Sequence, residues 1–216
     1  MKTIAAPLLI ALLATAAPAQ EDSVREYLSR WAGSLRDVRT LRVEFEQTKV
    51  LKVLRRPRTS RGEVLLDGER LRMTVRAESG AVETVLSVES GEARLYYPDL
   101  ARLEIYPSTG ESAARAPFPM FGADVEALPE LYAVGLEREG ARAVLVLEPR
   151  APASTMAAMR FGFDGDRLVQ VDRRERRGDS VSIRILAFEV NPTLPPDALH
   201  FEIPEGTKVV RPLQED

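Results

Sequence analysis

The hydrophobic period of the chain changes near residue 40. Before that point, apolar residues recur at steps of three and four, which predicts an amphipathic helix over Ser23–Asp37. Ser23 and Glu26 form a capping-box pattern at its start. From Thr40 onward apolar and polar residues alternate, which is typical of strands with one buried face.

Turn residues divide the alternating part into short strands. Asp67-Gly68, Ser90-Gly91 and Pro98-Asp99 are turn signals between them. The pattern predicts a mainly β (α+β) fold with a single curved antiparallel sheet, an unclosed half-barrel whose concave side holds the N-terminal helix. The predicted strands cover residues 40–53, 62–66, 71–75, 82–88, 93–97, 103–106, 131–137, 142–148, 159–163, 167–174, 180–190 and 199–203.

A central segment, residues 107–122, breaks the alternation. It is rich in Pro, Gly, Ser and Ala, yet it contains Phe118, Met120 and Phe121. Exposed loops usually lack large apolar groups. These residues therefore either pack on the core as part of a long loop or form a movable lid over a cavity. Residues 124–128 are a candidate short helix that Pro129 ends.

The first residues have the layout of a secretory signal peptide. Lys2 precedes an apolar run, Ile4–Leu13, and Ala17-Pro18-Ala19 is a small-x-small cleavage site. The run is shorter than the roughly 20 residues that cross a bilayer. We therefore expect residues 1–19 to be removed and residues 20–216 to form one domain outside the cytoplasm.

The chemical inventory argues against catalysis. The chain has no cysteine and one histidine, His200, and its formal net charge is −3 at pH 7. Zinc sites use several His or Cys ligands, and nucleic-acid binding needs clustered positive charge. We expect a monomer without metal, cofactor or nucleic acid, and no enzyme. A hydrolase with an unrecognised pair of carboxylates is the least favoured alternative.

Two basic stretches flank predicted hairpin turns. Both are either solvated hairpin tips or a docking patch for acidic partners or anionic headgroups. The first contains Lys49, Lys52, Arg55, Arg56, Arg58 and Arg61, and the second contains Arg173, Arg174, Arg176 and Arg177.

The order of these pieces resembles the periplasmic outer-membrane lipoprotein carrier family (LolA-like). The resemblance covers nearly all of the chain after the signal peptide. It rests on a set of short motifs in a shared order: Phe45-Glu46-Gln47, Gly62-Glu63-Val64, Leu71-Arg72, Tyr96-Tyr97-Pro98, the Pro-Phe-x-Met-Phe run from Pro117, Leu145-x-Leu147-x-Pro149, and Phe201-x-Ile203-Pro204-x-Gly206-x-x-Val209.

The resemblance implies an apolar cavity that binds acyl chains under a lid made by Phe118, Met120 and Phe121. It also implies acylated lipoproteins or lipid as cargo, an inner-membrane donor complex and an outer-membrane acceptor. Alternation along the strands selects the lining candidates on the inner face. These are Trp31, Leu35, Val43, Phe45, Met73, Val75, Leu95 and Tyr97.

One position departs from the family pattern. Family members often have a basic residue and a proline after the Gly-x-aliphatic strand, and that basic residue is linked with holding the lid closed. This chain has Asp67-Gly68-Glu69 there, so Arg70 and Arg72 are the candidate latch residues. An exported lipid- or lipoprotein-sensing regulatory protein on the same scaffold remains the alternative to a carrier.

Overall fold

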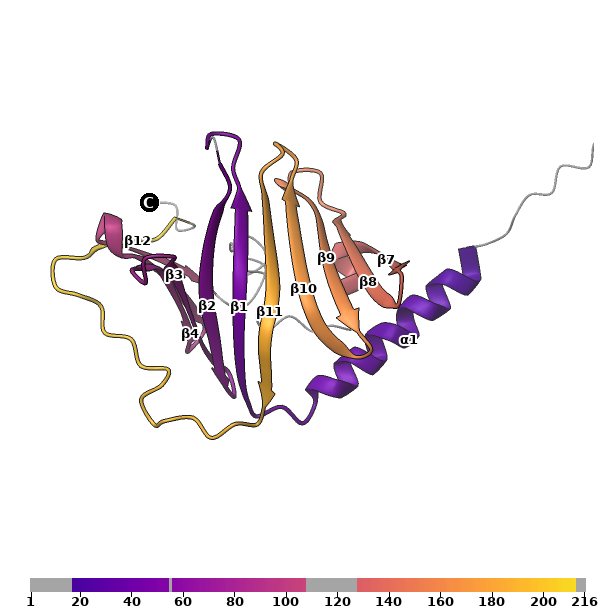
Figure 1. Cartoon of the computed structure of the whole chain (residues 1–216), viewed down its shortest axis with the longest axis horizontal. Helices are drawn as coiled ribbons and strands as arrows, with labels where there is room; N and C mark the ends of the chain where they lie inside the picture. The colour runs from indigo at the N-terminus through magenta and orange to yellow at the C-terminus, as the bar shows by residue number, and fades with distance from the viewer. Residues whose placement is uncertain (1–16, 55, 108–127, 213–216) are drawn as a thin grey trace, which may run out of the picture.

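The computed structural model describes residues 17–54, 56–107 and 128–212. The described chain forms two α-helices, one 3-10 helix and one sheet (Figure 1). The elements, in chain order, are α1 (Ala17–Leu35), β1 (Thr40–Val50), β2 (Arg58–Asp67), β3 (Arg70–Ala77), β4 (Val82–Glu89), β5 (Glu92–Tyr97), η1 (Pro98–Leu100), β6 (Arg102–Pro107), α2 (Leu128–Leu131), β7 (Tyr132–Glu139), β8 (Arg142–Pro149), β9 (Met156–Asp164), β10 (Arg167–Glu175), β11 (Ser180–Val190) and β12 (Lys208–Val210).

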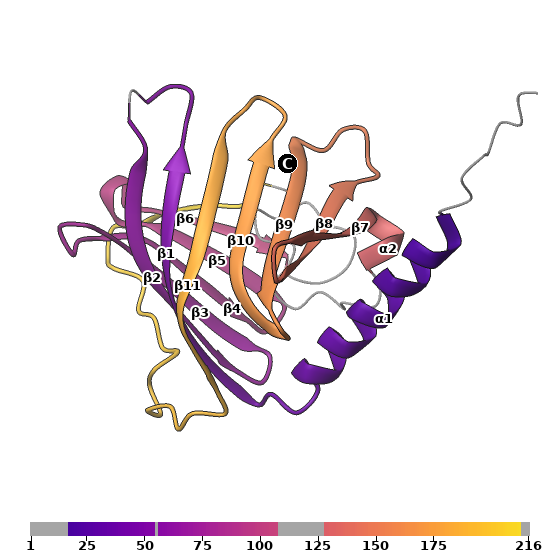
Figure 2. The same cartoon turned by 45° about the vertical axis from the view of Figure 1, so that its right-hand side comes forward.

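The twelve strands form one sheet in the order β12-β6-β5-β4-β3-β2-β1-β11-β10-β9-β8-β7. Strands β1–β6 make one meander and β7–β11 make another. The two meanders meet where β1 pairs with β11, from Leu41 opposite Val190 to Val50 opposite Ser180. The sheet curves strongly and stays open, so the predicted unclosed half-barrel is confirmed (Figure 2).

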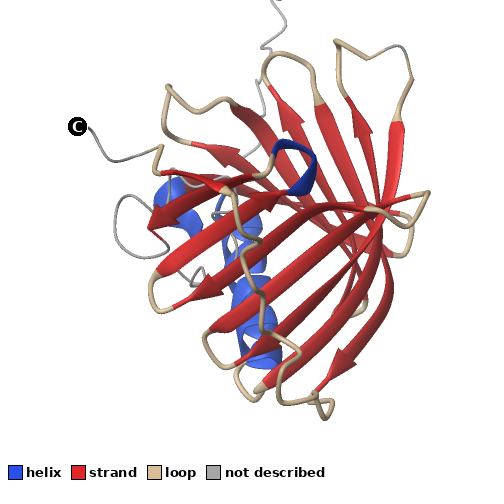
Figure 3. Cartoon of the chain, turned by 90° about the vertical axis from the view of Figure 1, so that its left-hand side faces the viewer, coloured by secondary structure: helices blue, strands red, loops and turns tan. Residues whose placement is uncertain are grey.

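The C-terminal part differs from the prediction. Residues 199–203 were expected to form a strand, but this segment pairs with no strand and crosses the outer, convex face of the sheet (Figure 3). The C-terminal segment carries the chain from β11, in the middle of the sheet, to the edge formed by β6. There β12 pairs with β6 in parallel. The sheet is therefore antiparallel except for this last short pair.

Helix α1 lies on the other side of the sheet from the C-terminal segment (Figure 3). It begins at Ala17, before the predicted start at Ser23, and ends at Leu35. Its buried residues Val24, Tyr27 and Leu28 pack against the β7–β9 part of the inner face. The predicted signal peptide, residues 1–19, lies mostly outside the described residues and stays a prediction.

Three apolar clusters hold the fold together. The helix-covered cluster joins α1 and α2 to the inner face of β7–β10. The central cluster occupies the inner face of β1–β6 and extends onto β11. The outer cluster, formed by Val85, Tyr96, Leu103 and Ile105, lies on the convex face of β4–β6, where Phe201 of the C-terminal segment packs on it. Phe201 is thus an apolar residue that is partly buried without strand pairing, which is why alternation alone suggested a strand there.

Candidate functional site

The central cluster is the candidate binding surface. Successive residues of a strand point to opposite faces, so every second residue of β1–β5 reaches the inner face. Each buried member of the cluster is at most 9% exposed. The buried members are Val43, Phe45, Val64, Leu71, Met73, Val75, Leu86, Ala93, Leu95 and Tyr106.

Six of the eight predicted lining residues come together on this surface. Val43, Phe45, Met73, Val75 and Leu95 are buried members, and Tyr97 packs against them. Trp31 lies instead in the helix-covered cluster, and the side chain of Leu35 is outside the described residues. The strand alternation therefore predicted one common face, whereas the helix period could not show which part of the sheet α1 would cover.

The Phe45 ring lies directly over Gly62 of the neighbouring strand. The two residues are cross-strand partners in β1 and β2. A Cβ at position 62 would lie 2.2 Å from Cζ of Phe45, so the ring covers the glycine directly. A glycine in a strand often marks such a close approach. The Phe45 ring can therefore lie over Gly62 only because that position has no side chain.

Trp31 belongs to an aromatic group that fastens α1 to the sheet. Its ring lies 5.2 Å from that of Phe163 and 5.6 Å from that of Phe161, measured between centroids. Tyr27 meets Phe163 edge-on at 5.4 Å. The Tyr27 hydroxyl donates to the Gly165 carbonyl at 3.3 Å. Such aromatic pairs are stabilising beyond their buried area, so this end of the inner face is a closed core.

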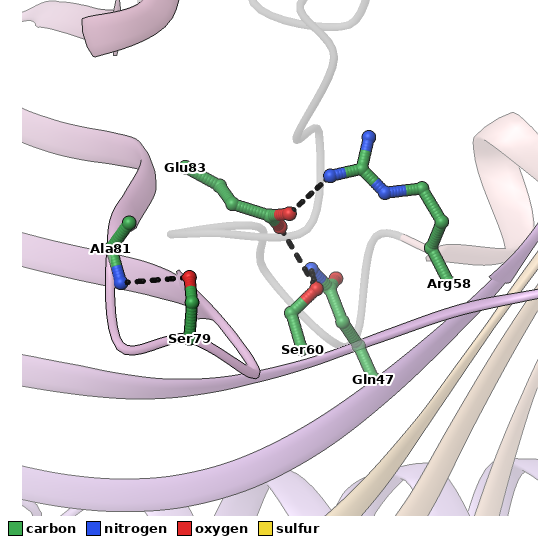
Figure 4. Close-up of polar contacts among 6 residues, drawn as sticks. All are labelled: Gln47, Arg58, Ser60, Ser79, Ala81 and Glu83. Atoms are coloured by element: carbon green, nitrogen blue, oxygen red, sulfur yellow. Dashed lines mark hydrogen bonds and ion pairs between the residues drawn. The ribbon is translucent and has the colours of Figure 1, made fainter.

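A polar group lies at the end of the inner face where β1 ends and β2 begins (Figure 4). Ser60 is 1% exposed and Gln47 is 5% exposed. The Ser60 hydroxyl donates to Oε2 of Glu83 at 2.9 Å, and Nη2 of Arg58 lies 2.6 Å from Oε1 of the same carboxylate. Gln47 Nε2 reaches the Ser60 hydroxyl at 3.4 Å. The central cluster therefore has a polar rim at one end.

The irregular pairing of β3 with β4 puts Glu83 in this group. Val75 pairs with Thr84 but Arg76 pairs with Val82, so Glu83 is the extra residue of a bulge. A bulge redirects a side chain that alternation would send to the other face. Lys49 joins the group: burial lowers the pKa of its ammonium below the ordinary value, and the nearby Glu83 carboxylate opposes that effect. Sequence patterns gave no signal for this bulge.

A second polar contact lies on the inner face at β6. The Tyr106 hydroxyl donates to Oε2 of Glu104 at 2.6 Å, and Nη2 of Arg102 lies 2.7 Å from Oε1 of Glu104. Burial raises the pKa of the Tyr106 phenol well above its ordinary value, and the hydrogen bond to Glu104 adds to this effect. The Tyr106 hydroxyl is therefore held protonated next to a carboxylate at the edge of the central cluster.

Comparison with known proteins identifies the family. Residues 36–202 match the family described as outer membrane lipoprotein carrier protein LolA. The chain belongs to this family. The LolA resemblance of the short motifs is thereby confirmed, and so is the half-barrel that it implied.

Two relatives carry the name of the LolA family's carrier proteins, and one solved structure shares the fold. The outer-membrane lipoprotein carrier protein of Hahella chejuensis is 25% identical over 188 residues, which is 83% of this chain and 86% of that protein. That of Chromobacterium violaceum is 27% identical over 198 residues, 90% of each chain. An uncharacterized conserved protein from Thermus thermophilus shares the fold with a TM-score of 0.55 at 15% identity, covering 88% of this chain and 99% of that one.

The candidate latch residues of this LolA-family chain lie away from the central cluster. Arg72 alternates with Met73 and points to the outer face. Its Nη1 donates to the carbonyls of His200 at 2.6 Å and Ala198 at 3.3 Å, so it fastens the C-terminal segment to the sheet. Arg70 pairs with Asp67 of the same turn at 2.5 Å. Phe118, Met120 and Phe121 lie outside the described residues, so the lid stays a prediction.

Arg72 also lines a groove on the outer face. It has a volume of about 340 Å³ and lies between the middle of β2–β3 and the C-terminal segment, where Thr74 and Ala198 line it. His200 is exposed and lies 3.6 Å from Glu202. Within the described ranges, no group of three or more His, Cys, Asp or Glu side chains is placed to hold a metal ion. No helix in those ranges is long and apolar enough to cross a membrane.

Proposed function

We propose that this chain is a periplasmic carrier that binds the acyl chains of lipoproteins against the central cluster and shuttles them toward the outer membrane. One observation carries the proposal: ten buried apolar side chains share the inner face of β1–β6. Among the side chains that the structure describes, the central cluster contains none from α1 or α2, and the buried ones of these helices belong to the helix-covered cluster. The inner face is thus divided into a helix-packed part and a part free of the described helices.

The energetics of an acyl chain suit such a surface. Burying one methylene contributes about 0.8 kcal/mol, so a sixteen-carbon chain gains around 10 kcal/mol when it leaves water. Met73 adds adaptable apolar surface in the middle of the cluster. The polar rim at Ser60 and Glu83 would limit how deeply an apolar chain lies and would meet its polar end.

The family supports the rest of the proposal. Relatives named as outer-membrane lipoprotein carriers align over most of this chain, which agrees with a non-enzymatic carrier in the periplasm. A predicted signal peptide over residues 1–19 agrees with the same compartment. An inner-membrane donor complex and an outer-membrane acceptor are the partners that this role requires.

The first experiment identifies the cargo. The protein is purified from its native compartment without detergent, and the bound apolar molecules are identified by mass spectrometry. Acylated peptides or lipids in a fixed ratio to protein are expected. Transfer of the bound acyl chain to a separately purified acceptor then distinguishes a carrier from a sensor, which would bind the same molecule and retain it.

A matched pair of variants locates the binding surface. Val75 and Val85 are each 3% exposed, but Val75 belongs to the central cluster and Val85 to the outer cluster. Val75→Trp fills the inner face and should lower acyl-ligand affinity at least tenfold, whereas Val85→Trp adds the same volume outside. Both substitutions overpack a core and should lower the free energy of unfolding by about 1–3 kcal/mol. Equal affinities in the folded fractions of the two variants would contradict binding at the central cluster.

A further inference from the structure

Two hairpins form one projecting tip at an end of the sheet. The loop between β1 and β2 and the loop between β10 and β11 lie side by side (Figures 1 and 2). The Lys52 backbone N–H donates to Oδ1 of Asp179 at 2.8 Å. Gly178 has a φ of +92°, and a Cβ there would lie 2.5 Å from Cε of Lys52. The two loops are therefore packed on each other and present one surface.

The tip exposes apolar side chains. Val53 is 88% exposed, Val50 is 44% exposed and Leu54 is 39% exposed. A hydrogen bond from the Leu54 N–H to the Leu51 carbonyl at 2.9 Å closes the turn that presents them. Single exposed apolar residues are common, but three within five positions on a projecting turn form an apolar point.

Basic residues surround this apolar point. The described residues of 49–58 and 173–179 include only two acidic side chains, Glu175 and Asp179. Asp179 accepts the Lys52 N–H, and Glu175 lies 2.5 Å from Arg173. The basic side chains in these two stretches are Lys49, Lys52, Arg56, Arg58, Arg173, Arg174, Arg176 and Arg177. Lys49 and Arg58 lie beside Glu83 of the polar rim, and Arg173 pairs with Glu175, so the basic collar of the tip consists of the other five.

The hairpin turns at the opposite end of the sheet carry more acidic than basic residues, and several of these carboxylates are paired with arginines of neighbouring elements. Four hairpin turns there join β2 to β3, β4 to β5, β7 to β8 and β9 to β10. Their acidic residues outnumber their basic residues, Arg70, Arg142 and Arg167. The acidic residues are Asp67, Glu69, Glu89, Glu92, Glu139, Asp164 and Asp166. A negatively charged surface therefore favours contact with the tip over contact with these turns of the net acidic molecule.

We infer that the tip docks this protein on an anionic phospholipid surface, with Val53 and Leu54 entering the headgroup region and the basic collar contacting lipid phosphates. Apolar side chains inside a basic ring are the combination that binds at a membrane interface. An acidic protein partner would satisfy the charges but leaves Val53 without a reason to be exposed. Binding of the tip to vesicles does not depend on which cargo the central cluster holds.

The test uses two vesicle compositions and the full mature chain. Vesicles of phosphatidylcholine with about one third phosphatidylglycerol should bind the protein, and vesicles of phosphatidylcholine alone should not. Each basic residue near such a surface changes affinity about fivefold, so Arg56→Gln with Arg177→Gln should weaken binding about 25-fold. The control, Arg142→Gln with Arg167→Gln, removes the same charge at the opposite end and should not weaken it.

Insertion is measured separately from charge attraction. Because the chain has no cysteine, Val53→Cys provides a single site for an environment-sensitive fluorophore. Its emission should shift to the blue on anionic vesicles. The same label at Val190→Cys, a 52% exposed position at the other end of β11, should not shift.

Three results would overturn the inference. The first is equal binding to neutral and anionic vesicles, and the second is equal loss in the two arginine pairs. The third is charge-dependent binding without a blue shift at position 53, which would assign the tip to an acidic protein or to surface adsorption. Circular dichroism and the unfolding midpoint confirm that each variant is folded, as expected for substitutions at exposed positions.

Discussion

The two halves of the inner face are built from the same kind of strand but are closed differently. On β7–β10, aromatic rings of the sheet meet Tyr27 and Trp31 of α1 at 5.2–5.6 Å between centroids. On β1–β6 the buried side chains are mostly aliphatic, and no residue of the described helices joins them. The first half is therefore closed by aromatic contacts with α1, whereas the second half is a mostly aliphatic cluster to which the described helices add no side chain.

Polar groups follow the same division. The central cluster is bordered by Glu83 with Ser60 at one place and by Glu104 with Tyr106 at another. In the helix-covered half, one ion pair joins Arg30 of α1 to Asp166 at 2.8 Å, and both side chains are exposed. Buried polar groups near an apolar surface cost free energy unless they are hydrogen-bonded. The hydrogen bonds of Ser60 and Tyr106 to Glu83 and Glu104 meet this requirement beside the central cluster.

The largest expected effect is on the helix-covered half. Phe163 is fully buried and contacts the rings of Tyr27 and Trp31. Phe163→Ala should reduce the free energy of unfolding by about 3–5 kcal/mol, because it leaves a cavity under α1. Urea denaturation measures the loss, and emission of Trp31, the only tryptophan, should shift to the red.

Phe201→Ala is the control for that variant. Phe201 is partly buried on the outer face, and its ring centroid lies 5.4 Å from that of Tyr96. A smaller loss of stability and unchanged Trp31 emission are expected. A Trp31 shift of similar size in both variants would contradict a separate helix-covered core.

The next prediction separates stability from binding. Leu95 is 2% exposed in the central cluster, and Leu103 is 1% exposed in the outer cluster. Leu→Ala at either position should cost about 2–5 kcal/mol of unfolding free energy. Only Leu95→Ala should also lower affinity for a fluorescent acyl ligand, by about tenfold, because methyl groups are lost from the binding surface. Equal affinities would mean that the ligand binds elsewhere.

A smaller effect is expected at Gly62. Gly62→Ala pushes a methyl group into the Phe45 ring and should cost about 1–3 kcal/mol through displacement of that ring. Gly135 of β7 is the matched control, since nothing lies within 4 Å of a Cβ placed there. Gly135→Ala should change the unfolding free energy by less than about 0.5 kcal/mol or increase it slightly. A comparison of urea midpoints decides between a contact effect and a general strand preference.

The smallest effect is pH-dependent. The pKa of Tyr106 is raised in the folded protein, so the unfolded chain releases this proton first as the pH passes about 10. The stability that Tyr106 contributes is complete below that pH and is lost above it, by up to about 1.4 kcal/mol per pH unit. The stability difference between the native protein and Tyr106→Phe should therefore shrink between pH 9.5 and 11. Glu104→Gln should weaken this dependence without abolishing it, because burial is the larger cause.

Much of the sheet and of the site could be predicted because alternation reports burial directly. Val43, Phe45, Met73, Val75 and Leu95 were selected by period alone and lie in one cluster. The same rule failed where pairing is irregular. Glu83 reaches the inner face only through a bulge, which depends on the register between β3 and β4 and not on local pattern.

Tertiary contacts decided the other differences. The helical period identified the apolar face of α1, but the aromatic rings of Phe161 and Phe163 determine where Trp31 lies. Arg72 was a candidate latch by its position in the sequence, and only the path of the C-terminal segment shows that it binds the carbonyls of Ala198 and His200. Contacts between residues so far apart in the sequence leave no pattern in the residues around either partner.

The meeting of β1 and β11 has a consequence for how the protein is made. Glu46 and Arg184, which pair across these strands, are 138 positions apart in the sequence. While the chain emerges from its N-terminus, β1 can pair with β2 but has no partner on its other side until β11 arrives. An open strand edge is a template for aggregation, and contacts of such long sequence separation form slowly. A truncation before Ser180 would therefore yield an aggregation-prone sheet with its middle strand exposed, and not a shorter form of the same protein.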